Sequence, residues 1–317
     1  MEANQISRSG PFPRLAVVTA LLTLGLIVFG AIVRVTDSGL GCGNDWPLCN
    51  GSIFPPLDNL TAWIEWLHRL FAALIGALGI AMLVFAWRAY RTRSRHILMA
   101  TIVAAVLFFI QSMLGALTVK LDLPPTIVTL HLGTAMLLLG ALLFAAVGAL
   151  YRQRVRYASD HVTLLAYITS GLSLVIILTG ALVRGSGATL ICEDWPLCNG
   201  QVFPVGQGTL ALVHMGHRYA VAALGLTIVL LVWYMLRTRQ DRNVRLMAVL
   251  ALITYLAQVV VGAFYVLTQA AVWTGAAHVG LAAATWSFLV CLSILEVLNT
   301  RAIPDQNTQG NTAWSLP

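Results

Sequence analysis

The sequence predicts an all-α membrane protein with eight transmembrane helices, arranged as two pseudo-symmetric four-helix bundles. Of its 317 residues, 59% are hydrophobic and 10% are charged, whereas a soluble domain carries about 25% charged residues. Eight apolar stretches of about 20 residues or more are each long enough to cross a bilayer as a helix. The second half of the chain also repeats motifs of the first at a spacing of about 149 residues.

The predicted spans follow one another with short connections. The first could be mistaken for a signal peptide, but it lacks a small-residue cleavage site and is followed by Arg34, part of a repeated motif, so we expect a retained span. Four spans in each repeat are an even number, so both copies enter the membrane in the same direction, as parallel repeats do. The spans lie near 14–36, 62–87, 97–119, 126–150, 162–184, 209–236, 246–268 and 273–298.

Arginine sets the expected orientation. Arginines gather in the connections at 88–95, 152–156 and 237–245. The opposite connections hold six acidic residues, which are Asp37, Asp45, Asp58, Asp122, Glu193 and Asp194. The positive-inside rule then places both termini in the cytoplasm and the long cysteine-containing loops outside the cell membrane. The net charge of +7 comes from this asymmetry. Because the basic residues form no single patch, we expect the lipid bilayer, and no nucleic acid, as a partner.

Two loops are near copies of each other. One carries Cys42 and Cys49 and the other Cys192 and Cys198, and both contain the sequence Asp-Trp-Pro-Leu-Cys-Asn-Gly. In an oxidising compartment, the pairs Cys42–Cys49 and Cys192–Cys198 are expected to form local disulfides. A zinc site built from all four cysteines is the alternative. Cys291 lies within the last span, where we expect a small buried apolar residue.

Four histidines repeat between the halves. Each lies on an even-numbered span, roughly 7–12 Å below the outer start of its helix. Two imidazoles that face each other across a four-helix bundle form a bis-histidine haem site. A bare metal ion is the alternative, but it usually needs further ligands at the same place. We therefore predict one haem in each half. The expected ligand pairs are His68 with His131 and His217 with His278.

Four arginines accompany these histidines. Arg69 and Arg218 directly follow two of the ligands, and Arg34 and Arg184 stand at the outer ends of the first and fifth spans. We expect them to meet haem propionates, and the alternative is that they reach lipid phosphates. Small residues in the spans allow close helix contact or leave room for a flat macrocycle. These glycines are Gly115, Gly133, Gly262 and Gly280.

The two copies of the repeat differ at the position three residues before the first repeated histidine of each half. Glu65 stands three residues before His68, whereas His214 occupies the corresponding place before His217. A carboxylate one turn from a haem ligand is costly in a membrane, so we expect Glu65 to serve a reaction at the porphyrin. An ion pair with a neighbouring arginine, Arg69 or Arg34, is the alternative. His214 is a candidate second-shell, propionate or spare-ligand residue of the other half.

Taken together, these features resemble the haem A synthase family over nearly the whole chain. The resemblance rests on eight spans in two halves, the Glu65-x-x-His68 motif, the other three histidines and the paired cysteine loops. It implies an oxidoreductase that converts haem O to haem A for cytochrome oxidase. The expected chemistry oxidises the C8 methyl to a formyl group by successive hydroxylations.

The resemblance also implies that the two halves of the chain have different functions. Residues 1–150 would bind the substrate haem O between His68 and His131, and residues 151–161 would form a cytoplasmic linker. Residues 162–317 would hold a haem b cofactor between His217 and His278 and end in a cytoplasmic tail. Glu65 falls on the essential acidic position of the family. Candidate partners are haem O synthase and a cytochrome oxidase subunit.

Two other functions account for part of the pattern. A di-haem b-type cytochrome that takes electrons from quinol explains four histidines, but it does not explain a carboxylate in one copy only. A transporter with parallel repeats predicts broken helices near the membrane midplane, whereas the polar residues here lie near the outer face.

Overall fold

The computed structural model describes residues 10–152 and 155–300. In this part of the chain, eight helices are long and apolar enough to cross a membrane, and their ends lie within a few residues of the predicted spans. The all-α membrane class is therefore confirmed. The helices are α1 (Pro11–Val35), α2 (Leu60–Tyr90), α3 (Arg95–Lys120), α4 (Pro125–Leu150), α5 (His161–Gly185), α6 (Thr209–Thr238), α7 (Arg242–Leu267) and α8 (Val272–Asn299).

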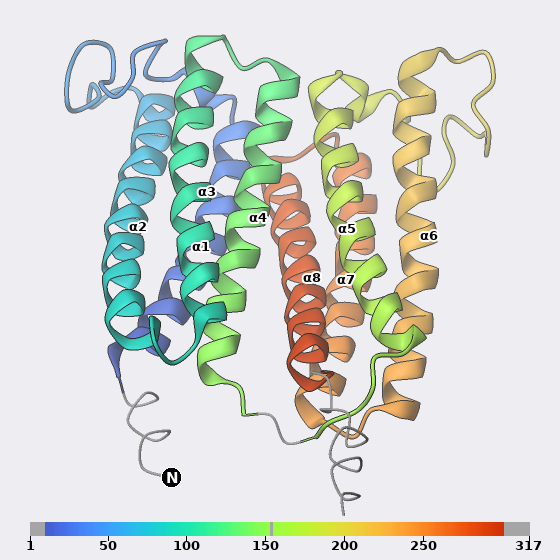
Figure 1. Cartoon of the computed structure of the whole chain (residues 1–317). Coiled ribbons are helices and arrows are strands. Elements are labelled where there is room, and N and C mark those ends of the chain that lie inside the picture. The colour runs from blue at the N-terminus through green and yellow to red at the C-terminus, as the bar shows by residue number, and fades with distance from the viewer. Residues whose placement is uncertain (1–9, 153–154, 301–317) are drawn as a thin grey trace, which may run out of the picture.

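Each half of the chain forms a closed ring of four helices. In the N-terminal half, α1 to α4 contact one another in order and α4 returns to α1; α5 to α8 repeat this pattern in the C-terminal half. The helices run side by side, with the long loops of 36–59 and 186–208 at one end, which we call the cysteine-loop end (Figure 1). Contacts of α1 with α8, α4 with α5 and α4 with α8 join the halves. This pattern is what a two-fold relation between the halves produces.

Local sequence explains where several helices begin. The Asn59 side chain accepts a hydrogen bond from the Ala62 N–H and caps α2, and Asp241 caps α7 through the N–H groups of Asn243 and Val244. Prolines occupy the first turns of α1 and α4, where a missing N–H costs nothing. Helix formation therefore follows from apolar length, and capping residues set the ends.

Small residues let the halves approach closely. A methyl group at Gly140 of α4 would lie 3.0 Å from the Trp286 side chain of α8. Two glycines noted in the sequence, Gly133 and Gly280, face Leu178 and Val28 of the opposite half. Their role in the structure is packing between the halves and not contact with a histidine.

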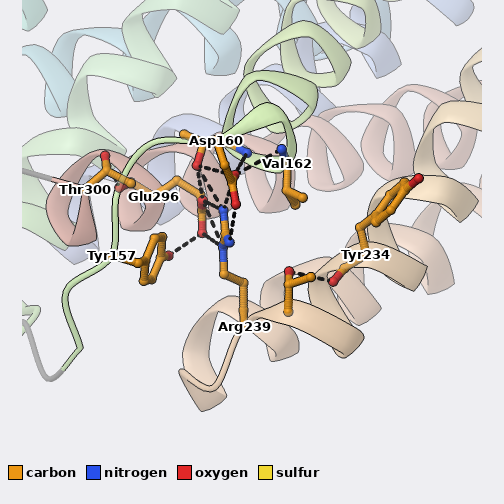
Figure 2. Close-up of polar contacts among 9 residues, drawn as sticks. Tyr157, Asp160, Val162, Tyr234, Arg239, Glu296 and Thr300 are labelled. Carbon is orange, nitrogen blue, oxygen red and sulfur yellow. Dashed lines mark hydrogen bonds and ion pairs between the residues drawn. The ribbon is translucent and has the colours of Figure 1, made fainter.

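A partly buried polar cluster joins segments of the C-terminal half at the end opposite the cysteine loops (Figure 1), and Figure 2 shows its contacts. Arg239 lies between Asp160 and Glu296, with Nη2 2.7 Å from Asp160 Oδ1 and 2.8 Å from Glu296 Oε2. The Thr163 hydroxyl donates to Glu296, and so does Tyr157. We call these five residues the Arg239 cluster. It ties the segment before α5 to the ends of α6 and α8.

The charges of this cluster depend on one another. Hydrogen bonds from Arg239 hold the pKa of Asp160 well below its usual range. Burial disfavours the charged form of Arg239, but hydrogen bonds to Asp160 and Glu296 outweigh burial and raise its pKa. Burial and the neighbouring Glu296 raise the pKa of Tyr157. The ion pair of Asp160 with Arg239 is therefore present throughout the neutral range.

Candidate functional site

The four repeated histidines lie at one level near the cysteine-loop end. Each stands six or eight residues after the first residue of its helix, α2, α4, α6 or α8, which is roughly 9–12 Å along the axis. Within each ring of helices the two histidines come from helices that face each other diagonally. His68 lies near His131, and His217 lies near His278. The structure thus brings together both predicted pairs.

A glycine on the neighbouring helix faces every one of these rings. A methyl group in place of the glycine hydrogen would lie 2.8–3.2 Å from the imidazole, closer than ordinary contact. The glycines therefore leave room for each imidazole against the neighbouring helix. Of the four, only Gly115 and Gly262 are among the glycines expected from the sequence to pack closely. The pairs are Gly30 with His68, Gly115 with His131, Gly180 with His217 and Gly262 with His278.

In the C-terminal half, both rings are fixed through Nδ1. His278 Nδ1 lies 3.3 Å from the Gln258 carbonyl, which can only accept, so Nδ1 carries the proton. His217 Nδ1 lies 2.9 Å from the Thr179 hydroxyl, which itself donates to the Ile176 carbonyl and therefore accepts from Nδ1–H. In this tautomer each Nε2 keeps its lone pair, as a metal ligand must. The pair fits a bis-histidine haem site.

The N-terminal half leaves its rings less constrained. The Phe29 ring packs against His68 with centroids 5.9 Å apart, at the position that Thr179 occupies in the other half. His131 contacts the Gln111 amide through Nε2 at 3.2 Å, and its buried Nδ1 has no partner. A buried polar atom without a partner is costly. These two imidazoles can also ligate a haem iron. Unlike the second pair, however, they are not held in the ligand tautomer by a hydrogen bond at Nδ1 before the haem binds.

Neither site gathers the ligands of a bare metal ion. Among the described residues, no group of three or more His, Cys, Asp or Glu side chains could hold one. Each half supplies two imidazoles. This is the donor set that a porphyrin completes, since the macrocycle provides the other four ligands of the iron.

Glu65 is tied to the loop above the first site. Its Oε2 accepts a 2.8 Å hydrogen bond from the Cys42 N–H, its Oε1 pairs with Arg69, and the residue is 4% exposed. The ion pair that we considered as an alternative role is therefore present. It fixes a carboxylate one helical turn above His68.

His214 takes the corresponding place in the second half. Its Nδ1–H donates to the Ala188 carbonyl at 2.9 Å, and the residue is 5% exposed. Like Glu65, it turns toward the loop and not toward the ring below it. His217, and not His214, is paired with His278.

Comparison with known proteins places the chain in a family. Residues 13–290 match the COX15-CtaA family, described as cytochrome oxidase assembly protein. The chain belongs to this family. Relatives named "Heme A synthase" are 33% identical in Symbiobacterium thermophilum (87% of this chain, 92% of the relative) and 33% identical in Shouchella clausii (91% and 98%). Another, from Alkalihalophilus pseudofirmus, is 30% identical over 88% of this chain and 95% of its own.

In this COX15-CtaA protein, disulfides close both cysteine loops. Cys42 is joined to Cys49, and Cys192 to Cys198, so the predicted pairing is confirmed and the zinc alternative is wrong. Both loops also contain a cis Trp-Pro peptide bond. All four cysteines are fully buried. The duplicated loops are thus compact structures above the two histidine pairs.

Two arginines anchor these loops to the helices. Arg69 donates to the carbonyls of Asp45 at 2.9 Å and Leu48 at 2.8 Å, and Arg218 donates in the same way to Pro196 and Leu197. The Arg69 guanidinium therefore joins the first loop to Glu65. Both arginines are expected from the sequence to meet haem propionates, and their bonds to the loop carbonyls were not expected.

The other two arginines lie where the halves meet. Arg184 Nη2 is 3.5 Å from Asp37 Oδ1, a contact between the C-terminal and N-terminal halves. Arg34 interacts with both of these charges. The Arg184 Nε is buried without a partner, so this guanidinium can bind a further acceptor. Arg34, Arg184 and Asp37 thus lie together at the cysteine-loop end of the interface between the two halves, which we call the seam.

Proposed function

We propose that this chain is a haem A synthase that oxidises the C8 methyl of haem O to a formyl group by successive hydroxylations. The observation that carries the proposal is Glu65, a fixed carboxylate one turn from His68 in only one of two matched histidine pairs. The names of the relatives support it. The product, haem A, would serve cytochrome oxidase, in keeping with the family description.

The two halves would then have different tasks. His68 and His131 would hold the substrate haem O, and His217 and His278 would hold a haem b cofactor, whose iron supplies one-electron chemistry when it is bound. Hydrogen bonds at Nδ1 keep the second pair in the ligand tautomer at all times, as suits a permanent group. The first pair lacks them, as suits a molecule that enters and leaves.

Glu65 can assist the reaction in two ways. An ionised carboxylate stabilises the positive charge that builds at a methyl carbon as electrons leave it. It can also accept a proton from a water molecule at the site. Both roles need its negative charge, and both need it to be held in place. Arg69 and the Cys42 N–H do this, so Arg69 is a positioning residue.

The remaining assignments are parts of the same proposal. Arg34 and Arg184 would meet propionates at the seam, where the Arg184 Nε lacks a partner. Arg69, Arg218 and His214 would shape the rims of the two sites. Both termini would lie in the cytoplasm and the cysteine loops outside. Haem O synthase and a cytochrome oxidase subunit are the proposed partners, because substrate and product are both membrane-soluble.

Replacing Glu65 tests the function. Wild type and Glu65→Gln are each coexpressed with a source of haem O, so that the cell supplies the oxidant, and the haems extracted from the purified proteins are separated by chromatography. The variant should keep haem O bound and produce no haem A, because its shape is preserved and its charge is lost. Glu193→Gln, in the exposed loop of the other half, is the control and should convert haem O normally. Full conversion by Glu65→Gln contradicts the proposal.

The alternative function keeps one specific observation in its favour. Two matched histidine pairs suit a di-haem b-type cytochrome that moves electrons from quinol. Such a protein would return haem O unchanged from the wild type as well as from the variant. The same chromatogram therefore separates the two functions.

A further inference from the structure

The N-terminal half contains a cavity deeper in the bundle than its histidines. It has a volume of about 80 Å³ and lies among α1, α2, α3 and α4, well above the roughly 10–15 Å³ that one water molecule needs. We infer that this cavity receives the isoprenoid chain of the substrate haem, an inference that rests on the proposed function.

The cavity lies directly beneath the histidine site. On every helix, lining residues stand 7 and 11 residues deeper than the histidine or the glycine that faces it. Because steps of 7 and 11 return to the same side of a helix, these residues continue the face that carries the rings, roughly 10 and 16 Å further along. They are Ile75 and Gly79 below His68, Leu138 and Leu142 below His131, Thr23 and Thr19 below Gly30, and Phe108 and Ala104 below Gly115.

The C-terminal half fills the corresponding space. Gly79 stands 11 residues after His68, and Ile228 stands 11 residues after His217. Ile228 is fully buried in the core of its half, whereas a methyl group at Gly79 would meet nothing within 4 Å. Ala105 of the cavity wall is likewise replaced by Leu252, which packs against the same core. At both positions the C-terminal half therefore has a larger side chain packed in its core than the N-terminal half has at the cavity.

The lining selects an apolar guest. The hydroxyls of Thr19 and Thr23 donate to carbonyls of their own helix, at 2.8 Å each, and Thr101 does the same at 2.9 Å. No polar hydrogen of these side chains is left to bind a polar guest, and apolar cavities stay dry and take up apolar molecules. Ile80, on the rim, is 68% exposed, so a chain longer than the cavity can continue out of the bundle.

The difference between the halves matches the difference between the two haems. Haem O carries a long isoprenoid substituent that haem B lacks, and the proposed function places haem O in the first half and haem b in the second. A cavity beneath the substrate site and a filled core beneath the cofactor site are what these two ligands require. The cavity would let the enzyme distinguish its substrate from haem B by the chain alone.

Filling the cavity tests this inference. Gly79→Ile introduces the residue of the other half, and haem O and haem B are each titrated into the purified holoprotein, with haem b already bound in the C-terminal half. Affinity for haem O should fall about fifteenfold, the loss expected when two methylene groups are kept out. Affinity for haem B should change less than twofold. Ala105→Leu should act in the same direction if Gly79→Ile does not fold.

The control is Gly25→Ile, the same exchange at an exposed position of α1 where a methyl group also meets nothing within 4 Å; it should alter neither affinity. The inference is overturned if affinity falls equally for both haems, or if affinity for haem O does not fall. Unchanged affinity for haem O is also the result expected if a lipid chain fills the cavity. Conversion of haem O by the wild type and by Gly79→Ile is measured separately in cells that make haem O and supply the oxidant. Its absence in the wild type defeats the proposed function, whereas normal conversion with unchanged haem O affinity in Gly79→Ile defeats the cavity alone.

Discussion

The hydrogen bond from His217 to Thr179 gives a direct test of the cofactor site. Thr179→Val keeps the shape of the side chain but removes the acceptor of the 2.9 Å bond from Nδ1–H. A buried donor left unpaired costs about 1–3 kcal/mol, and loss of an outer partner of a ligating histidine usually lowers metal affinity 10–100-fold. We therefore expect haem b to bind 10–100-fold more weakly.

The assay is a spectroscopic titration of purified protein with haem B, followed at the low-spin haem bands, together with the midpoint potential of the bound haem. Thr227→Val is the matched control, because the Thr227 hydroxyl bonds only to the Leu224 carbonyl of its own helix. The control should behave like the wild type. If Thr179→Val leaves both affinity and midpoint potential unchanged, the tautomer argument for His217 is wrong.

Three further predictions concern stability and positioning. Glu296→Gln should lower the free energy of unfolding by about 1.5–3 kcal/mol, because it removes one of the two carboxylates that pair with the buried Arg239; an unchanged thermal midpoint in detergent would contradict this. The depressed pKa of Asp160 means that its ion pair stabilises the fold above about pH 4, the ordinary range of this side chain, and that this contribution disappears as the pH falls further. Asp160→Asn should therefore lower the midpoint at pH 7 and flatten its fall toward pH 3, and a profile parallel to the wild type would show that the pair is unimportant. Arg69→Gln should reduce haem A formation at least tenfold while haem O still binds, whereas Arg218→Gln in the other half should not; equal effects of the two would argue against a positioning role for Arg69.

Much of the fold could be predicted because membrane helices are specified by composition. Long apolar stretches must satisfy their backbone groups internally and so form helices, and the repeat then predicts two similar bundles. The Arg239 cluster could not be predicted in this way. Arg239 was one of several arginines expected to mark the cytoplasmic side, and nothing local shows that it is 4% exposed and paired with a glutamate near the end of α8.

The candidate site, like the fold, could be predicted only in part from the sequence. The histidine pairs and Glu65 follow from the repeat, since an aligned pair of copies reveals both what recurs and what differs. Thr179 was missed because a threonine in an apolar helix usually bonds its own backbone, which it also does here. Gly30 and Gly180 each stand four residues before a repeated arginine, so the alignment contained that signal. Which ring each glycine faces depends on tertiary packing.

The most direct test of the proposed function is a haem analysis, with haems B, O and A resolved, of wild-type protein purified from cells that also make haem O and supply the oxidant. The account predicts haem B retained by the C-terminal half together with newly formed haem A. Recovery of haem B and unchanged haem O, with no haem A, would contradict it.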